Sequence, residues 1–263
     1  MLDLELTDRV AIVTGGSDGL GRATVERLAA EAAIVVTCAR RADHLEQVTE
    51  QLRSATNGQI HPIAMDVSSA DDCARTIETT VNKFGRIDIL VNNAGASAAA
   101  GFETVSDDEW QSDIDLKLMG AIRMCRGVIP IMRQNGGGSI VNATIGGAKA
   151  PAAQSLPTTV TRAAGINLTK SLANEYAADN IRVNTICIGL IKSAQWERRA
   201  AGKTPADSIP VDDFYNTMAK RIPMGRMGEA TEYADLVAFL CSARGGYITG
   251  TSINLDGGLC AVD

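Results

Sequence analysis

Short apolar, β-branched runs alternate with helix-length segments along the whole chain. The apolar runs are Val10–Thr14, Ile34–Thr37, Ile60–Asp66, Ile87–Asn92, Gly138–Asn142, Ile181–Ile186 and Ser252–Leu255. Nearly continuous apolar runs, rather than alternating polar and apolar positions, are typical of strands buried on both faces. The intervals between the runs are long enough for one crossover helix each, which favours parallel strands. The pattern therefore predicts a three-layer, doubly wound α/β fold with a seven-stranded parallel sheet.

The first interval shows the helical pattern that this fold requires. Val25, Leu28 and Ala29 share one helix face, whereas Glu26 and Arg27 lie off it. No internal repeat and no low-complexity linker interrupts the alternation. We therefore expect residues 1–263 to form a single domain.

The alternation breaks between Lys192 and Ile222. This stretch is polar, carries Pro205 and Pro210, and is followed by the next apolar run only near Ser252. Long insertions after the carboxyl end of a strand are where α/β enzymes place substrate lids. We expect such a lid near residues 192–222.

Composition narrows the possible function classes. Hydrophobic residues make up 45% of the chain and charged residues 21%, with both signs interspersed, which argues against disorder. The net charge is −6 and no basic stripe is present, so we expect no nucleic-acid binding. Residues 1–9 are too poor in apolar residues for a signal peptide, and no run approaches the roughly 18 apolar residues of a membrane helix. These features predict a cytoplasmic protein without a membrane partner.

The cysteines and histidines argue against a metal site. The six cysteines are scattered without a CxxC pair, and several lie within apolar runs, so we interpret them as reduced packing residues. His44 and His61 are the only histidines. We predict no metal.

A glycine-rich turn follows the first apolar run. The sequence reads Thr-Gly-Gly-Ser-Asp-Gly-Leu-Gly over residues 14–21 and then continues as a helix. Glycines allow positive φ and close approach of the backbone to a ligand, and the start of a helix favours a pyrophosphate. A glycine cluster alone also fits a plain tight turn, but its place between a strand and an amphipathic helix favours a dinucleotide site.

The spacing TGxxxGxG resembles that of the short-chain dehydrogenases/reductases. Four further motifs, in the same order, extend the resemblance over nearly the whole chain: Asp66-Val67, Asn92-Asn93-Ala94-Gly95, Ile181-Arg182-Val183-Asn184, and Ile248-Thr249-Gly250 with Asp256-Gly257-Gly258. The resemblance implies a Rossmann-type fold. It also implies a cofactor site made of Gly15, Ser17, Asp18, Gly19, Leu20, Gly21, Arg40, Asp66, Val67, Asn93, Ala94, Gly95, Arg162, Gly189 and Ile191.

The end of the second apolar run bears on the choice of cofactor. An acidic residue there would bind a ribose 2′-hydroxyl and favour NAD. The chain instead has Ala39-Arg40-Arg41, and Arg40 could pair with a 2′-phosphate. We therefore favour NADP, with NAD possible and a solvated Arg40 as the alternative.

The resemblance also implies a catalytic tyrosine, lysine, serine and asparagine, and this chain departs from all four. The family's YxxxK segment aligns with residues 158–162, so Thr158 takes the tyrosine position and Arg162 the lysine position. The serine falls on Ile145. The asparagine, which follows a characteristic tryptophan, falls on Lys117 after Trp110.

These replacements change the available chemistry. Thr158 is a poor acid, because an aliphatic hydroxyl titrates far above the tyrosine pKa of about 10. Arg162 stays charged and can hold a ribose or an anion, but it does not shuttle protons. Lys117 is the one replacement with acid–base potential. Ser155, three residues before Thr158, could reach the site if its loop folds inward, although a plain loop serine is the alternative.

Three functions remain open. The first is an NADP-dependent oxidoreductase on a small-molecule carbonyl or alcohol, with Lys117 as proton donor, Thr158 or Ser155 orienting the oxygen, and Arg162 on the nicotinamide ribose. The second is a non-redox enzyme, because an arginine at the lysine position resembles the halohydrin dehalogenases, although those lack the glycine turn. The third is a catalytically silent cofactor-binding subunit. The resemblance implies a homo-oligomer, a dimer or tetramer, built on helices near residues 109–131 and 159–178.

Overall fold

The structure, a computed structural model, describes residues 3–202 and 207–262. The strands of these residues form one parallel sheet in the order β3-β2-β1-β4-β5-β6-β7. They are β1 (Val10–Thr14), β2 (Ile34–Ala39), β3 (Ile60–Ala64), β4 (Ile89–Asn92), β5 (Gly138–Ile145), β6 (Ile181–Ile188) and β7 (Ser252–Leu255). The predicted doubly wound, seven-stranded parallel sheet is confirmed.

Strand β5 is longer than its sequence pattern suggests. The apolar run was expected to end at Asn142, but the strand continues to Ile145. Asn142 is buried and polar, and it accepts a hydrogen bond from Asn92 of β4 and donates one to Thr169. A polar side chain whose donor and acceptor are both hydrogen-bonded can lie inside a sheet. The polar residue Asn142 therefore does not mark the end of the strand.

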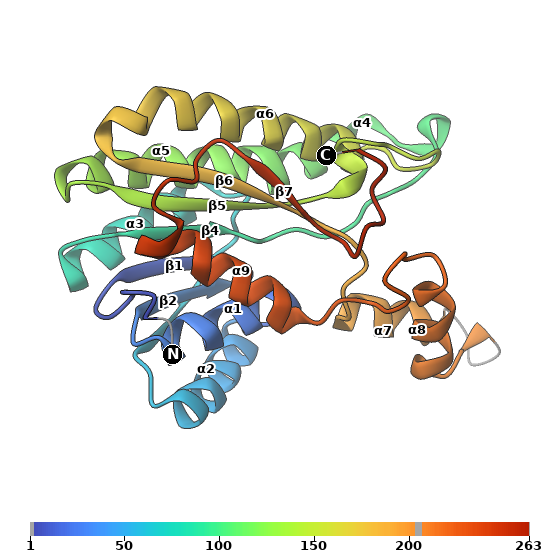
Figure 1. The fold of residues 1–263 in the computed structure, drawn as a ribbon, viewed down its shortest axis with the longest axis horizontal. Helices are drawn as coiled ribbons and strands as arrows, with labels where there is room; N and C mark the ends of the chain where they lie inside the picture. The colour runs from blue at the N-terminus through green and yellow to red at the C-terminus, as the bar shows by residue number, and fades with distance from the viewer. Residues whose placement is uncertain (1–2, 203–206, 263) are drawn as a thin grey trace.

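Helices cover both faces of the sheet (Figure 1). The α-helices of the described residues are α1 (Gly19–Ala30), α2 (Ala42–Thr56), α3 (Ala70–Phe84), α4 (Asp107–Ile114), α5 (Gly120–Gln134), α6 (Thr158–Tyr176), α7 (Ala194–Ala200), α8 (Val211–Ala219) and α9 (Ala230–Cys241). Helices α1, α2 and α9 contribute to one apolar cluster, and α3, α5 and α6 contribute to another. The molecule therefore has three layers.

Successive strand residues point into different layers of the core. In β1, Ala11 and Val13 belong to the cluster beneath α1 and α9, whereas Ile12 belongs to the cluster beneath α3 and α5. Leu90 of β4 shares the second cluster with Ile12. Burial on both faces explains why these strands are nearly continuous apolar runs.

Helix α4 is followed by an irregular turn rather than by one straight helix. The structure places a π-helical turn at Asp115–Met119, between α4 and α5. The start of α4 is fixed by Ser106, whose side chain accepts a hydrogen bond from Glu109 N while Glu109 bonds back to Ser106 N. π turns occur often at functional sites, and this one contains Lys117.

The expected lid contains two helices, α7 and α8. In Figure 1 they lie apart from the three layers, near the carboxyl ends of the strands. Ile191 forms a bridge with Gly228, which fixes the base of this segment to the body. Pro205 and its neighbours at 203–206 lie outside the described residues. Within the described part of the chain, no helix is long and apolar enough to cross a membrane.

Candidate functional site

A cleft of about 1240 Å³ opens at the carboxyl ends of the strands, where β1 and β4 lie next to each other. The strand order reverses at this point, and doubly wound sheets bind ligands in the crevice formed there. Of the fifteen residues that the family pattern assigns to a cofactor, all line the cleft except Gly21. Gly21 lies beneath the turn, since a Cβ at this position would lie 2.1 Å from Gly15 O.

The glycine turn forms a cradle for a ligand. Gly15 has φ +70°, and a Cβ there would lie 3.0 Å from the Cα of Ala94. Asp18 precedes α1 but makes no side-chain cap to it. The first N–H groups of α1 are therefore left without a side-chain cap, as a bound pyrophosphate requires.

The side chain of Asp18 instead contacts residues at the start of α2. Its carboxylate accepts one hydrogen bond from Arg41 at 2.9 Å and lies 3.2 Å from His44 Nε2. The neighbouring Arg40 lines the cleft without a salt bridge to any described residue. Asp66 is held by the N–H and hydroxyl of Ser68, and these hydrogen bonds lower the pKa of its carboxyl group.

The segment after β4 supports the turn from the other side. Asn93 Nδ2 donates to Thr14 O at 3.1 Å, and the Ala94 amide donates to Thr14 Oγ1. Gly95 lies against Arg162, because a Cβ at Gly95 would be 2.3 Å from Arg162 Nη2.

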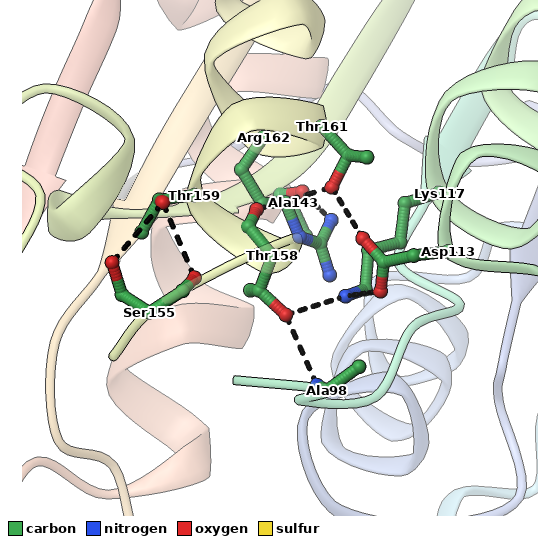
Figure 2. Close-up of polar contacts among 9 residues, drawn as sticks. All are labelled: Ala98, Asp113, Lys117, Ala143, Ser155, Thr158, Thr159, Thr161 and Arg162. Carbon is green, nitrogen blue, oxygen red and sulfur yellow. Dashed lines mark hydrogen bonds and ion pairs between the residues drawn. The ribbon is translucent and has the colours of Figure 1, made fainter. Parts of the chain in front are cut away.

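Four polar side chains gather where α4, the π turn and α6 meet (Figure 2). Lys117 Nζ bonds to Asp113 Oδ1 and donates to Thr158 Oγ1 at 2.9 Å. Thr161 Oγ1 donates to Asp113 Oδ2 at 2.6 Å. Burial lowers the pKa of Lys117, and its hydrogen bond to Asp113 acts in the opposite direction.

Lys117 lies behind Thr158 rather than in the cleft. Its side chain is 1% exposed, and it lines a small inner cavity instead of the cleft, whereas Thr158 lines the cleft. That Lys117 is the proton donor stays a prediction, and this geometry places Thr158 between Lys117 and the cleft. Thr158 Oγ1 accepts hydrogen bonds from Lys117 Nζ and from Ala98 N at 3.0 Å, so its own proton remains available to a group in the cleft.

Arg162 lines the cleft from α6. One guanidinium nitrogen donates to Ala143 O of β5, while Nε is buried without a hydrogen-bond partner among the described residues. Burial lowers the pKa of Arg162, but an arginine still keeps its charge. The other end of the guanidinium, beside Gly95, faces a residue that lines the cleft.

The remaining candidates differ in their relation to the cleft. Ser155 lines it, but its hydroxyl donates to Ala152 O and pairs with Thr159 Oγ1 at 3.2 Å. Gly189 and Ile191 line the cleft at the end of β6, and Trp196 lines it from α7. Within the described residues, no group of His, Cys, Asp and Glu side chains could hold a metal ion.

Asp113, Thr161 and Ala98 belong to the cluster around Thr158 but are not predicted from the sequence. Asp113 is 4% exposed and precedes Lys117 by one helical turn. That spacing is the signal that could have identified Asp113, since side chains four residues apart on a helix are neighbours. Thr161 and Ala98 carry no comparable pattern.

Comparison with known proteins covers nearly the entire chain. A family model described as enoyl-(acyl carrier protein) reductase matches residues 15–260. The 3-oxoacyl-[acyl-carrier-protein] reductase FabG of Thermotoga maritima is 32% identical over 258 residues, covering 97% of this chain and 99% of the relative. Dehydrogenase/reductase SDR family member 4 of Oryctolagus cuniculus is 34% identical over 258 residues, covering 96% and 94%.

Solved structures of other reductases also match this chain over nearly its whole length. L-sorbose reductase from Gluconobacter frateurii, complexed with NADPH and L-sorbose, matches with a TM-score of 0.96 at 33% identity, covering 100% of both chains. Levodione reductase matches with a TM-score of 0.91 at 30% identity, covering 98% of this chain and 100% of the other. These matches agree with the glycine cradle and the sheet topology described above, and the chain belongs to the short-chain dehydrogenase/reductase family.

Proposed function

We propose that this protein is an NADP-dependent oxidoreductase that acts on a small carbonyl or alcohol compound through an atypical catalytic site. The observation that carries the proposal is the contact of Lys117 Nζ with Thr158 Oγ1 at 2.9 Å, with Thr158 facing the cleft. This hydrogen bond connects the buried amine of Lys117, which is the acid–base group, to the hydroxyl of Thr158, which can contact the substrate.

The residues of the cleft fit the cofactor. The Gly15 turn and the uncapped start of α1 suit a pyrophosphate, and Arg40, free of salt bridges among the described residues, suits a 2′-phosphate. Arg162 would hold the nicotinamide ribose, because its Nη2 lies beside Gly95, which lines the cleft. The bound nicotinamide would supply a hydride in reduction or take one up in oxidation.

The protein's own part is the movement of a proton. In reduction, the substrate oxygen accepts the hydroxyl proton of Thr158, and Thr158 Oγ1 recovers a proton from the Lys117 ammonium group. Lys117 is left neutral beside Asp113, and solvent restores its proton. The lowered pKa of Lys117 makes it a better acid than a solvated lysine. Oxidation runs the same steps in reverse, with neutral Lys117 as the base.

A matched pair of variants tests the hydroxyl. Thr158→Ser keeps the hydroxyl and should retain most of the activity, whereas Thr158→Val should lower kcat by about 100-fold, the low end of general acid–base effects. Activity would be followed as NADPH oxidation over a panel of ketones. Equal activity of the serine and valine variants would contradict the role of Thr158.

A second pair tests the cofactor by calorimetric titration with NADPH and NADH. Arg40→Gln should remove the preference for NADPH, whereas Arg41→Gln should keep it, because Arg41 is already paired with Asp18. Failure of both dinucleotides to bind would overturn the redox proposal. Tight NADPH binding without turnover of any carbonyl or alcohol would instead favour a catalytically silent subunit.

A further inference from the structure

The charges that line the cleft differ in sign from the chain as a whole. The protein has a net charge of −6. The described residues that line the cleft nevertheless include six arginines against three aspartates (Arg40, Arg41, Arg162, Arg198, Arg199, Arg221, Asp18, Asp66 and Asp256). A cleft that concentrates one sign of charge attracts ligands of the opposite sign.

Each of the three aspartates already has a hydrogen-bond or salt-bridge partner within the protein. Asp18 pairs with Arg41, and Asp66 accepts hydrogen bonds from Ser68. Asp256 accepts hydrogen bonds from the amides of Gly258 and Cys260. None of these carboxylates forms a salt bridge with an arginine of the lid segment.

Three of the arginines belong to the lid segment and are not used by the cofactor assignment. Arg198 and Arg199 lie on α7, and Arg221 follows α8. Across residues 3–202 and 207–262, no salt bridge engages any of the three, whereas nearby Arg226 pairs with Glu232 at 2.7 Å. The single carboxylate of α7, Glu197, forms no salt bridge with these arginines within the described part of the chain.

Arg199 is held in place without a carboxylate. Its guanidinium lies 4.8 Å from the ring centroid of Trp196, and Trp196 packs on Phe214 of α8 with ring centroids 6.1 Å apart. Stacking on an aromatic ring orders an arginine while leaving its N–H groups free to bind an anion. Trp196 and Arg199 both line the cleft.

We infer that the substrate carries an anionic group, a carboxylate or a phosphate, which Arg198, Arg199 and Arg221 bind on the lid side of the cleft while the reacting oxygen lies at Thr158. Guanidinium groups bind both anions through paired N–H···O bonds. This inference rests on the proposed function for the identity of the reacting group. The binding of the anion itself can be measured without turnover.

Two matched pairs of substrates test the inference and separate its two anions. Acetoacetate is compared with its neutral ethyl ester, and dihydroxyacetone phosphate with neutral dihydroxyacetone. We expect kcat/KM for the preferred anion to exceed that of its neutral partner by at least about tenfold. Arg199→Gln and Arg221→Gln should each remove most of that preference through KM. Arg75→Gln removes a charge on α3, where Arg75 pairs with Asp72 away from the cleft, and should change neither value.

Binding supplies a readout that does not depend on hydride transfer. In a Trp110→Phe background Trp196 is the only tryptophan, and its fluorescence should change with the preferred anion and not with the neutral partner. A neutral compound that is reduced as well as its anionic partner would overturn the inference and leave the oxidoreductase intact. If no compound is reduced but an anion binds and Arg199→Gln abolishes the binding, the proposed function fails and the anion site stands. If neither anion binds, the inference is wrong.

Discussion

Gly95 is the residue whose replacement should act on Arg162 without removing any charge. A methyl group there would meet Arg162 Nη2 at 2.3 Å, so the guanidinium must move. We expect Gly95→Ala to weaken NADPH binding by roughly tenfold, as for the loss of one charge-assisted hydrogen bond. Only the end of a flexible side chain is displaced, so the midpoint of urea unfolding should change little. Unchanged NADPH affinity by calorimetry would argue against contact between Arg162 and the cofactor.

The protonation of Lys117 should determine how kcat for the reductive reaction falls at alkaline pH. Its pKa is lowered by burial, and its protonated form is the acid. As pH rises through that lowered pKa the acid is lost, so kcat should fall at a pH below the value of about 10.4 that is usual for lysine.

The matched variant is Lys117→Arg, which keeps a buried cation beside Asp113 but does not release a proton in this range. We expect a residual rate at least about 100-fold lower than that of the wild type, with no alkaline fall. A stopped-flow pH profile decides the matter, and an alkaline limb that persists in Lys117→Arg would assign the titration to another group.

At the scale of elements, Asp113 joins α4 and the π turn to α6. It accepts hydrogen bonds from Lys117 and Thr161, and both its own side chain and that of Lys117 are nearly inaccessible to solvent. Asp113→Asn leaves the Lys117 charge buried without a carboxylate and should lower the free energy of unfolding by about 3–5 kcal/mol.

Urea denaturation measures that loss, and the double variant Asp113→Asn/Lys117→Met provides its control. Removing both charges should recover part of the stability, because no unpaired ion remains. If the single and double variants lose the same free energy of unfolding, charge compensation between Asp113 and Lys117 does not stabilise the fold.

Some of these elements and contacts could be predicted from the sequence and others could not. The positions of β1 and β7 follow directly from apolar runs, and the glycine turn from local chemistry, because each signal lies within a few adjacent residues. The contact between Asp113 and Thr161 joins residues 48 positions apart, and the buried Lys117 lies in the π turn, which no periodic pattern in the sequence marks. Neither can be found from local patterns, which is why the sequence could not place Lys117 behind Thr158.

At the scale of the molecule, cofactor binding should raise the resistance to heat. A ligand at 100 times its Kd stabilises the folded state by about 2.7 kcal/mol, which corresponds to roughly 5–10 °C in Tm for a chain of this size. We expect NADPH to produce this shift in differential scanning fluorimetry and NADH at equal concentration to produce a smaller one. In Arg40→Gln the two shifts should become similar. A larger shift with NADH in the wild-type protein would reverse the assigned cofactor preference.

The sheet order has a consequence for biosynthesis. Strand β1 is made first and lies third in the sheet, between β2 and β4. It ends at Thr14 and β4 begins at Ile89, so 75 residues (89 − 14) must be added before its second edge can pair. At ribosomal rates of roughly 5–20 residues per second this takes about 4 to 15 seconds. During that time the nascent chain exposes an unpaired apolar strand edge, the kind of surface on which partly made proteins associate with one another.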